Sequence, residues 1–217
     1  MKKKIIALLE REYGLPKREG LDDPLEELVL TLLSQNTNDR NRDRAWEAIR
    51  QAFPNWGRVV NAGTAHLAKV IRPGGLARVK AQRIIAILKD IKRKYGKYDL
   101  GFLRRMSRDE ARSILLSFTG VGPKTAACVL LFSCGKPAFP VDTHIHRVAS
   151  RLGLILPRTT REKAHEILEE IVPEDKYYSF HLNMIQHGRI VCKAQRPRCR
   201  ECVLLPHCPY GKKPLKV

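Results

Sequence analysis

Apolar residues recur at the three- and four-residue spacing of amphipathic helices along nearly all of this 217-residue chain. In DDPLEELVLTLLS the apolar stripe consists of Leu25, Leu28, Val29, Leu32 and Leu33. No segment shows the convincing apolar–polar alternation of a strand, and glycine and proline separate the helical segments. The spacing therefore predicts an all-α fold of about ten helices joined by short loops.

Capping patterns predict where several of these helices begin. Pro24 suits the first position of a helix. Ser107 with Glu110, and Thr159 with Glu162, have the spacing of capping boxes. The segment KAQRIIAILKDIKRKYG repeats the apolar stripe at Ile84, Ile87, Leu88, Ile91 and Tyr95. We expect these helices to form the core.

The charge of the chain indicates a polyanionic partner. Forty-one Lys and Arg residues face 22 Asp and Glu, a formal net charge of +19 that must be held against self-repulsion. No apolar run approaches the roughly 20 residues that span a bilayer, and the apolar part of MKKKIIALLERE is too short for a signal peptide. We therefore expect an intracellular protein that binds nucleic acid rather than a membrane.

One turn has the composition of a phosphate clamp. In FTGVGPKTAA, Gly120 and Gly122 bracket Val121, and a proline then restarts a helix. Glycines allow close approach of the backbone, and a helix N-terminus presents unpaired N–H groups with partial positive charge. An ordinary corner between two helices is the alternative. Lys124 and Thr125 follow directly, and Lys124 enters the apolar segment 117–133, where an ammonium is expensive without a partner or a task.

The six cysteines fall into two groups. Cys128 and Cys134 belong to the apolar segment and are expected to be buried, inert thiols. The other four are expected to hold a metal in a protein without signs of secretion; they are Cys192, Cys199, Cys202 and Cys208. Zinc ribbons generally have two close cysteine pairs, whereas only one close pair is present here, so both zinc and an iron–sulfur cluster stay open on spacing.

Three motifs in this order resemble the endonuclease III family of helix-hairpin-helix DNA glycosylases. They are GVGPKTA, Asp142 in VDTHIHRV eighteen residues after Lys124, and the C-x6-C-x2-C-x5-C ending. The resemblance extends from about Leu25 to Cys208. It implies that the four cysteines hold a [4Fe–4S] cluster, that Lys124 is the catalytic nucleophile and that Asp142 is its acidic partner.

The activity implied by the resemblance is base excision coupled to strand nicking. A neutral amine attacks the sugar, expels a damaged pyrimidine and leaves a Schiff base that undergoes β-elimination. A fixed carboxylate stabilises the positive charge that develops. Burial and a helix N-terminus both disfavour the ammonium form of the lysine. The alternative for Lys124 is a phosphate contact, and Asp142 is expected to cap the VDTHIHRV helix as well.

The resemblance also implies where damaged double-stranded DNA is held. Base flipping leaves a gap that side chains fill, and the family pattern places two positions there, Asn36, with Gln35 just before it, and Leu76. Other expected contacts are the hairpin residues Gly120, Val121, Gly122 and Thr125, then His144, and the loop cations Lys193, Arg196 and Arg198. Asn36 replaces a family glutamine and Pro123 a frequent arginine, which leaves the lesion spectrum open. His146 is expected to pack.

The expected architecture has two helical lobes around a DNA-binding cleft. Residues 17–134 would form a helical barrel, and residues 1–16 with 135–217 a second lobe that includes the cluster loop, 192–208. We expect a cytoplasmic, nucleoid-associated monomer, with a nuclear location also open. Two alternative functions remain at this level, a mismatch or uracil glycosylase of the same superfamily and a non-catalytic helix-hairpin-helix DNA-binding protein.

Overall fold

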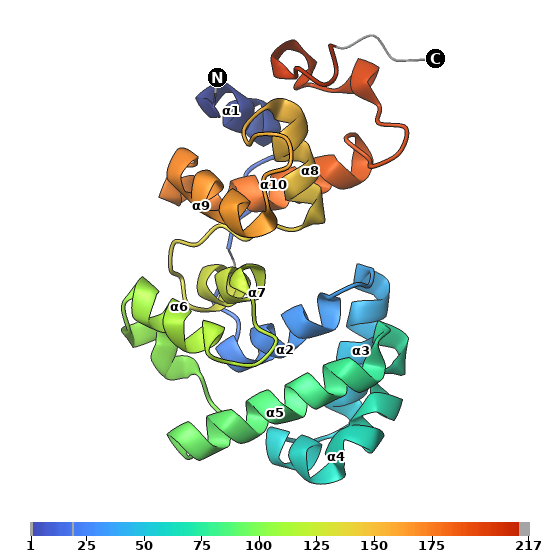
Figure 1. The fold of residues 1–217 in the computed structure, drawn as a ribbon, viewed down its shortest axis with the longest axis vertical. Helices are drawn as coiled ribbons and strands as arrows, with labels where there is room; N and C mark the ends of the chain where they lie inside the picture. Colours follow the sequence, from blue (N-terminus) through green and yellow to red (C-terminus); the bar gives the residue numbers. More distant parts are fainter. Residues whose placement is uncertain (1, 19, 213–217) are drawn as a thin grey trace. The chain divides into compact units, whose positions relative to one another are not determined.

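The computed structural model describes residues 2–18 and 20–212, and the regular secondary structure within them consists of helices joined by loops (Figure 1). Ten α-helices lie in these residues, as the apolar spacing predicts. Their bounds are α1 Lys2–Tyr13, α2 Pro24–Ser34, α3 Asp39–Ala52, α4 Trp56–Val70, α5 Ala77–Tyr95, α6 Arg108–Leu116, α7 Pro123–Cys128, α8 Thr143–Leu152, α9 Arg161–Ile171 and α10 Tyr177–Ile190.

Short helical turns connect or extend these helices. A π-helical segment, η3, continues α7 over Val129–Ser133. The 3-10 turns are η1 Arg72–Gly74, η2 Gly101–Arg105, η4 Glu174–Lys176, η5 Cys199–Glu201 and η6 Leu205–His207. None of the described helices is both long and apolar enough to cross a membrane.

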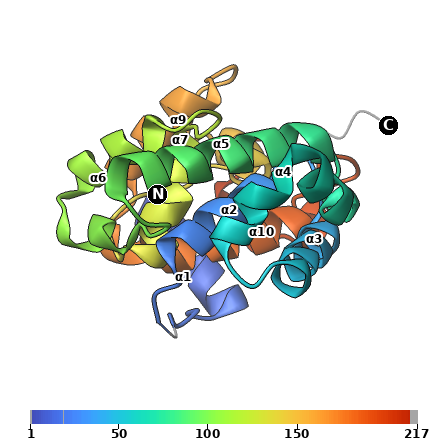
Figure 2. The same ribbon diagram turned by 90° about the horizontal axis from the view of Figure 1, so that it is seen from below.

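The chain divides into two compact units, Met1–Gly20 with Pro137–Val217, and Leu21–Lys136. These bounds lie a few residues from the divisions at 17 and 134 that the sequence suggests. In the unit Leu21–Lys136, α5 packs along α4, and α2 packs against α3, α7 and η3 (Figure 2). The predicted α2 stripe forms part of its core, because Leu25, Leu28, Val29, Leu32 and Leu33 are all buried.

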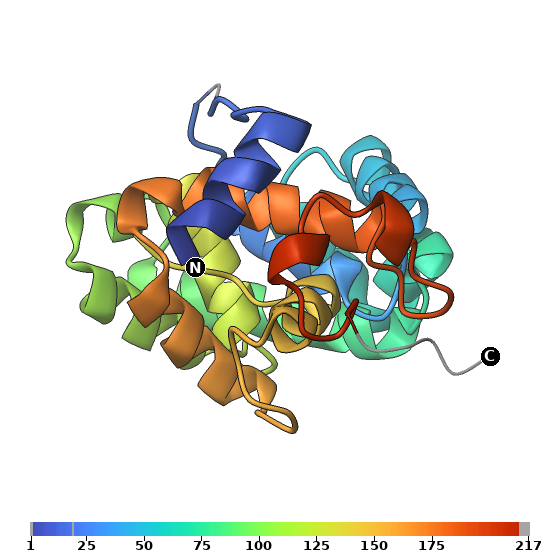
Figure 3. The same ribbon diagram turned by 90° about the horizontal axis from the view of Figure 1, so that it is seen from above.

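The other unit is built around α10, which packs against α1 and α8 (Figure 3). Its core contains Ile5 and Leu9 of α1 together with Phe180 and Met184 of α10. The chain then runs from α10 into the segment that carries the four grouped cysteines. This unit therefore joins the N-terminal helix to the C-terminal loop.

The capping patterns have two outcomes. Ser107 and Glu110 form the predicted capping box, with the Ser107 hydroxyl accepting from the Glu110 N–H and the Glu110 carboxylate accepting from the Ser107 N–H. The second prediction is wrong by one residue, because Thr160 caps α9 by accepting from the Lys163 N–H at 3.2 Å. Thr159 lies in the preceding turn, where its hydroxyl donates to the Leu156 carbonyl at 2.7 Å.

Candidate active site and cysteine cluster

The glycine-rich turn between α6 and α7 is a tight, solvent-exposed hairpin. Gly120 has φ +83°, a conformation that favours glycine, and the Val121 N–H donates to the Phe118 carbonyl at 3.1 Å. Gly122 is the N-cap of α7 and has no side chain with which to cap it. Val121 is only 7 % exposed, whereas Gly120 is exposed and Gly122 is half-buried. The glycines therefore carry the accessible backbone of the hairpin, which a phosphate clamp requires.

Lys124 lies half-buried on the first turn of α7, directly after this hairpin. The next residue, Thr125, is only 3 % exposed, so this predicted contact residue is buried. The apolar continuation of the helix is buried as predicted, including Cys128 and Cys134. Burial raises the pKa of the Cys134 thiol to about 11, which confirms that it is an inert thiol.

A carboxyl group on α2, that of Glu27, lies close enough to Lys124 to be affected by its charge, and nothing in the sequence indicated this. Removal from water raises the pKa of Glu27 above its ordinary value, while a hydrogen bond from Thr31 and the positive charge of Lys124 oppose that rise. The Thr31 hydroxyl donates to Oε1 of Glu27 at 2.8 Å. The sequence feature that could have indicated this hydrogen-bonded carboxyl is the i, i+4 spacing of Glu27 and Thr31 beside an apolar stripe.

Asp142 is the N-cap of α8, as the sequence predicts. Its Oδ1 accepts a hydrogen bond from the Ile145 N–H at 2.7 Å, which fixes the direction of the carboxylate. His144 follows on the first turn, where its Nδ1 lies 3.0 Å from a guanidinium nitrogen of Arg147. His146 packs with Nε2 2.8 Å from the Thr159 carbonyl, as predicted. Lys124 and Asp142 belong to different units, and their facing each other stays a prediction.

The two predicted insertion positions share an unusual backbone conformation. Asn36 has φ +51° and Leu76 has φ +47°, in the left-handed region that non-glycine residues seldom adopt. Both side chains are exposed, Leu76 to 56 %. Gln35, by contrast, is half-buried and its Oε1 accepts from Arg83 at 3.0 Å. Asn36 and Leu76 are therefore the outward-facing pair, and Gln35 is held by the protein.

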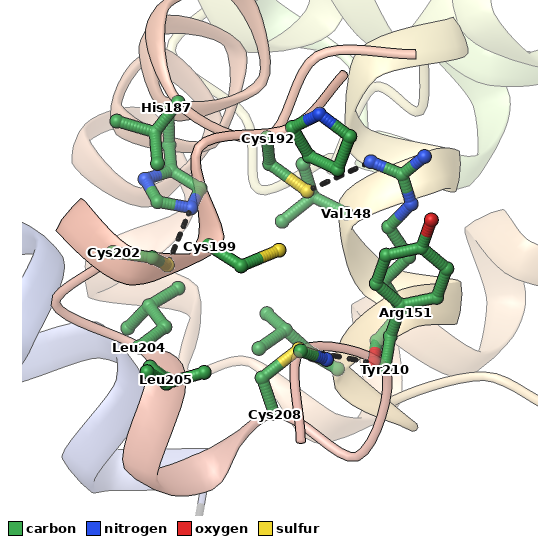
Figure 4. A pocket seen from close by; sticks show the side chains of 14 residues that line it. Val148, Arg151, His187, Cys192, Cys199, Cys202, Leu204, Leu205, Cys208 and Tyr210 are labelled. Atoms are coloured by element: carbon green, nitrogen blue, oxygen red, sulfur yellow. Dashed lines mark hydrogen bonds between the residues drawn. The ribbon is translucent and has the colours of Figure 1, made fainter. Parts of the chain in front are cut away.

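The four grouped cysteines line one apolar pocket beside α8 and α10 (Figure 4). Three of the four thiols have a polar neighbour. Arg151 donates to Sγ of Cys192 at 3.3 Å, and the Gly211 N–H donates to Sγ of Cys208 at 3.4 Å. Nε2 of His187 lies 3.5 Å from Sγ of Cys202. Burial lowers the pKa of His187 to about 4, so its ring is neutral and is itself oriented by the Tyr13 hydroxyl at Nδ1.

The donor set of this pocket fits an iron–sulfur cluster. Four thiols and no carboxylate line it, and thiolates are the ligands of such clusters. In the part of the chain that the structure describes, no three His, Cys, Asp or Glu side chains converge as the ligands of one metal ion do. Burial raises the pKa of the Cys202 thiol to about 11, and a bound metal would favour its thiolate form.

The loop between the first two of these cysteines is held from α8. Arg151 donates to the carbonyls of Lys193 and Ala194, at 2.6 and 3.0 Å, and its guanidinium lies over the Tyr210 ring, 4.4 Å from the centroid. The predicted contact residues Lys193, Arg196 and Arg198 are all exposed. The sequence analysis missed Arg151, since only the fold brings α8 to this loop.

Comparison with known proteins agrees with this geometry. Residues 29–174 match the family model described as the HhH-GPD superfamily base excision DNA repair protein. The chain is 35 % identical to endonuclease III of Thermotoga maritima over 211 residues, covering 96 % of this chain and 94 % of the relative. It is 35 % identical to the Bacillus subtilis endonuclease III over 191 residues, or 88 % and 83 % of the two chains.

A solved structure of the same family gives the same result. This fold superposes on a trapped endonuclease III–DNA covalent intermediate, an estranged-adenine complex, with a TM-score of 0.85, 29 % identity and 98 % coverage of both chains. The match extends over both compact units, the hairpin and the four-cysteine segment. The chain belongs to the endonuclease III family of HhH-GPD proteins, and it is a base excision repair DNA glycosylase with AP lyase activity.

Proposed function

We propose that this enzyme removes oxidised pyrimidines from double-stranded DNA and nicks the resulting abasic site, with Lys124 as the nucleophile. The observation that carries this proposal is the place of Lys124, which lies half-buried on the first turn of α7, directly behind the exposed glycine hairpin. Its charge also acts to lower the pKa of Glu27. A phosphate held at the hairpin would bring the adjoining deoxyribose close to this amine. A relative solved as a covalent intermediate with DNA supports an attack by a protein group.

The reaction begins with the neutral amine of Lys124. Its nitrogen bonds to C1′ of the sugar as the bond from C1′ to the base breaks, and the base leaves with that electron pair and takes up a proton. The sugar ring opens to give a protonated Schiff base. Loss of a proton from C2′ then expels the 3′ phosphate with the electrons of its C–O bond, and water releases the lysine.

Asp142 is proposed to stabilise the positive charge that builds on the sugar. Its Oδ1 is held by the Ile145 N–H, so the carboxylate has a fixed direction and does not reorganise during the reaction. A carboxylate can also accept or orient the proton that the lysine loses. The proposal requires the two units to bring Asp142 and Lys124 to the same sugar.

We further propose that Cys192, Cys199, Cys202 and Cys208 hold a [4Fe–4S] cluster. When bound, the cluster would pin the two ends of the basic loop, so that Lys193, Arg196 and Arg198 reach a DNA phosphate backbone from an ordered segment. Iron, sulfide and zinc analysis of anaerobically purified protein tests this assignment. About four irons per chain is the expected result, and stoichiometric zinc without iron would exclude it.

Borohydride trapping tests the role of Lys124. Reduction converts a Schiff base into a stable amine, so the wild-type protein should become covalently attached to duplex DNA that contains an abasic site. Lys124→Ala should give no adduct, and Lys124→Arg, which keeps a positive charge for a phosphate contact, should give none either. Equal trapping by Lys124→Ala would overturn the assignment.

A panel of duplexes tests the substrate class. We expect excision of thymine glycol and dihydrouracil to exceed that of uracil, mismatched thymine and 8-oxoguanine. Preference for uracil or a mismatch would instead support the alternative glycosylase. Schiff-base trapping through Lys124 would count against a glycosylase that uses no amine nucleophile. We also propose that the enzyme acts as a monomer in the cytoplasm, at the nucleoid, where its DNA substrate lies.

A further inference from the structure

The lysine at position 80 is buried without a carboxylate partner. Lys80 lies on the first turn of α5 and is only 2 % exposed. Burial lowers the pKa of its ammonium group, and the recorded partners among the described residues are two backbone carbonyls. A buried ammonium is costly, so an apolar side chain would fill this place at a lower cost. A lysine is present because its ammonium group donates hydrogen bonds to two carbonyls, which an apolar side chain cannot do.

The two carbonyls lie two and three residues before the predicted insertion positions. Nζ of Lys80 donates to the Leu33 carbonyl at 2.6 Å and to the Gly74 carbonyl at 2.8 Å. Leu33 belongs to the last turn of α2, three residues before Asn36. Gly74 ends η1, two residues before Leu76. One ammonium group therefore ties together the bases of two loops that are distant in the sequence.

The two loops end in the same strained conformation. Asn36 and Leu76 both have positive φ angles, which cost energy in non-glycine residues and persist only when the surroundings impose them. Lys80 provides such a constraint, because a cation satisfies carbonyls at the C-terminal end of α2 that have no partner within the helix. The strained residues thus occur in the two loops that the Lys80 ammonium ties together, and we refer to this pair of hydrogen bonds as the Lys80 clamp.

A second side chain of the same helix face extends this arrangement. Arg83, three residues after Lys80, donates to Oε1 of Gln35 at 3.0 Å. Its Cδ lies 2.8 Å from the position that a Cβ on Gly120 would occupy, so it packs on the hairpin as well. The beginning of α5 therefore contacts the Gln35–Asn36 loop, the Gly74–Leu76 loop and the glycine hairpin.

We propose that Lys80 is a positioning residue that sets Asn36 and Leu76 as a fixed pair for insertion into the DNA stack. It touches neither DNA nor the reacting atoms, and it acts by holding the two loops at one separation. This inference rests on the insertion roles proposed for Asn36 and Leu76. It predicts that loss of Lys80 damages base extrusion and excision more than it damages general affinity for DNA.

The test compares two variants of α5 that both remove a buried side chain. Lys80→Met keeps most of the volume and removes the clamp, whereas Leu88→Ala makes a cavity two turns further along the helix, where the side chain is also fully buried. For each variant we would measure thermal unfolding, single-turnover excision of thymine glycol, and Kd for undamaged duplex. Insertion is read from the fluorescence of 2-aminopurine placed beside a tetrahydrofuran abasic-site analogue.

The expected result for Lys80→Met is a loss of about tenfold or more in the single-turnover rate, since small displacements at a reacting centre are costly. The 2-aminopurine signal should fall with it, while Kd for undamaged duplex stays within a factor of about three. Leu88→Ala should retain the rate and the signal although it is destabilised. A normal rate and signal in Lys80→Met, or an equal loss in Leu88→Ala, overturns the proposal.

Two further variants distinguish a failure of this proposal from a failure of the insertion roles proposed for Asn36 and Leu76. Asn36→Ala and Leu76→Ala should each lower the 2-aminopurine signal; if neither does, the insertion roles are wrong and the clamp falls with them. If both do and Lys80→Met does not, only the clamp is wrong. Should Lys80→Met fail to fold, Lys80→Gln serves instead, because its shorter, uncharged side chain cannot donate to both carbonyls. A rate and signal equal to wild type in Lys80→Gln would then overturn the proposal, and a fall in both would support it.

Discussion

The guanidinium of Arg83 donates to the side-chain carbonyl of Gln35 at 3.0 Å, joining residues that lie 48 positions apart in the sequence. The same arginine covers Gly120, where an added Cβ would lie 2.8 Å from its Cδ. The glycine hairpin is thus packed against α5 on one side. Its other glycine, Gly122, has no atom within 4 Å of an added Cβ and has an ordinary backbone conformation.

This difference predicts opposite effects for two alanine substitutions. Gly120→Ala should destabilise the protein by about 1–3 kcal/mol, because it combines a positive φ with a clash. Gly122→Ala should leave the thermal midpoint near that of wild type and still weaken duplex binding, because a methyl group there meets only the approaching phosphate. Thermal denaturation and fluorescence anisotropy measure the two effects. Unchanged DNA affinity in Gly122→Ala would refute phosphate binding at the hairpin.

Two substitutions of Asp142 should distinguish its role as a helix cap from its role in the chemistry. Asn accepts the same hydrogen bond from the Ile145 N–H, so Asp142→Asn should fold with wild-type stability and lose most of its base excision. Asp142→Ala should in addition lose about 1 kcal/mol of stability as the cap disappears. Denaturant unfolding and single-turnover excision distinguish the two. Excision by Asp142→Asn at the wild-type rate would show that the carboxylate is only structural.

Glu27 should influence both stability and the pH dependence of catalysis. Its raised pKa means that the folded state prefers the protonated carboxyl, so this group costs stability once the pH rises above the ordinary value for glutamate. Glu27→Gln should therefore be more stable than wild type at pH 8, and this advantage should shrink as the pH falls through the range in which the carboxyl protonates. Denaturant unfolding at pH 4, 6 and 8 checks the sign.

The same substitution should move the acidic limb of the lyase profile. An ionised Glu27 favours the ammonium form of Lys124, so Glu27→Gln should leave the amine neutral at lower pH and shift that limb in the acidic direction. Thr31→Val, which removes the hydrogen bond but keeps the carboxyl, serves as the control. A limb shifted towards alkaline pH in Glu27→Gln would contradict this coupling.

Arg151 should be needed to keep the cysteine loop ordered. Arg151→Met removes its bonds to Sγ of Cys192 and to the carbonyls of Lys193 and Ala194. We expect the purified variant to contain less iron than wild type and to lose it faster to a chelator. Arg161→Met, an exposed position on α9, should retain wild-type iron. Equal iron retention by Arg151→Met would show that the loop needs no such support.

The exposed cations of this loop should differ in their effect on DNA binding. Arg198 pairs with Glu201 at 3.6 Å, whereas no carboxylate lies within ion-pair distance of Lys193 or Arg196 among the described residues. Lys193→Gln or Arg196→Gln should lower the slope of log affinity against log salt by about 0.9, the value for one lost phosphate contact. Arg198→Gln should lower it less. Titrations of an undamaged duplex at several salt concentrations measure the slopes.

The sequence by itself determined which segments are helical and which residues are grouped for chemistry. The stripe of α2, the Ser107 cap and the Asp142 cap depend on residues within one or two turns, so local spacing predicts them. Thr160 rather than Thr159 caps α9 because the preceding turn engages Thr159, a competition that the capping pattern does not contain. The family motifs identified the hairpin, Lys124 and the four cysteines by their order alone.

Only the tertiary structure decided which distant side chains support that chemistry. Lys80 reads as an ordinary exposed lysine at the start of a basic helix, yet it is buried because the fold brings to it the carbonyl of a residue 47 positions away. Glu27 comes within electrostatic reach of Lys124, and Arg151 holds the cysteine loop, for the same reason. Burial and electrostatic environment arise from packing between helices, and packing between segments far apart in the chain leaves no periodic signal in either segment.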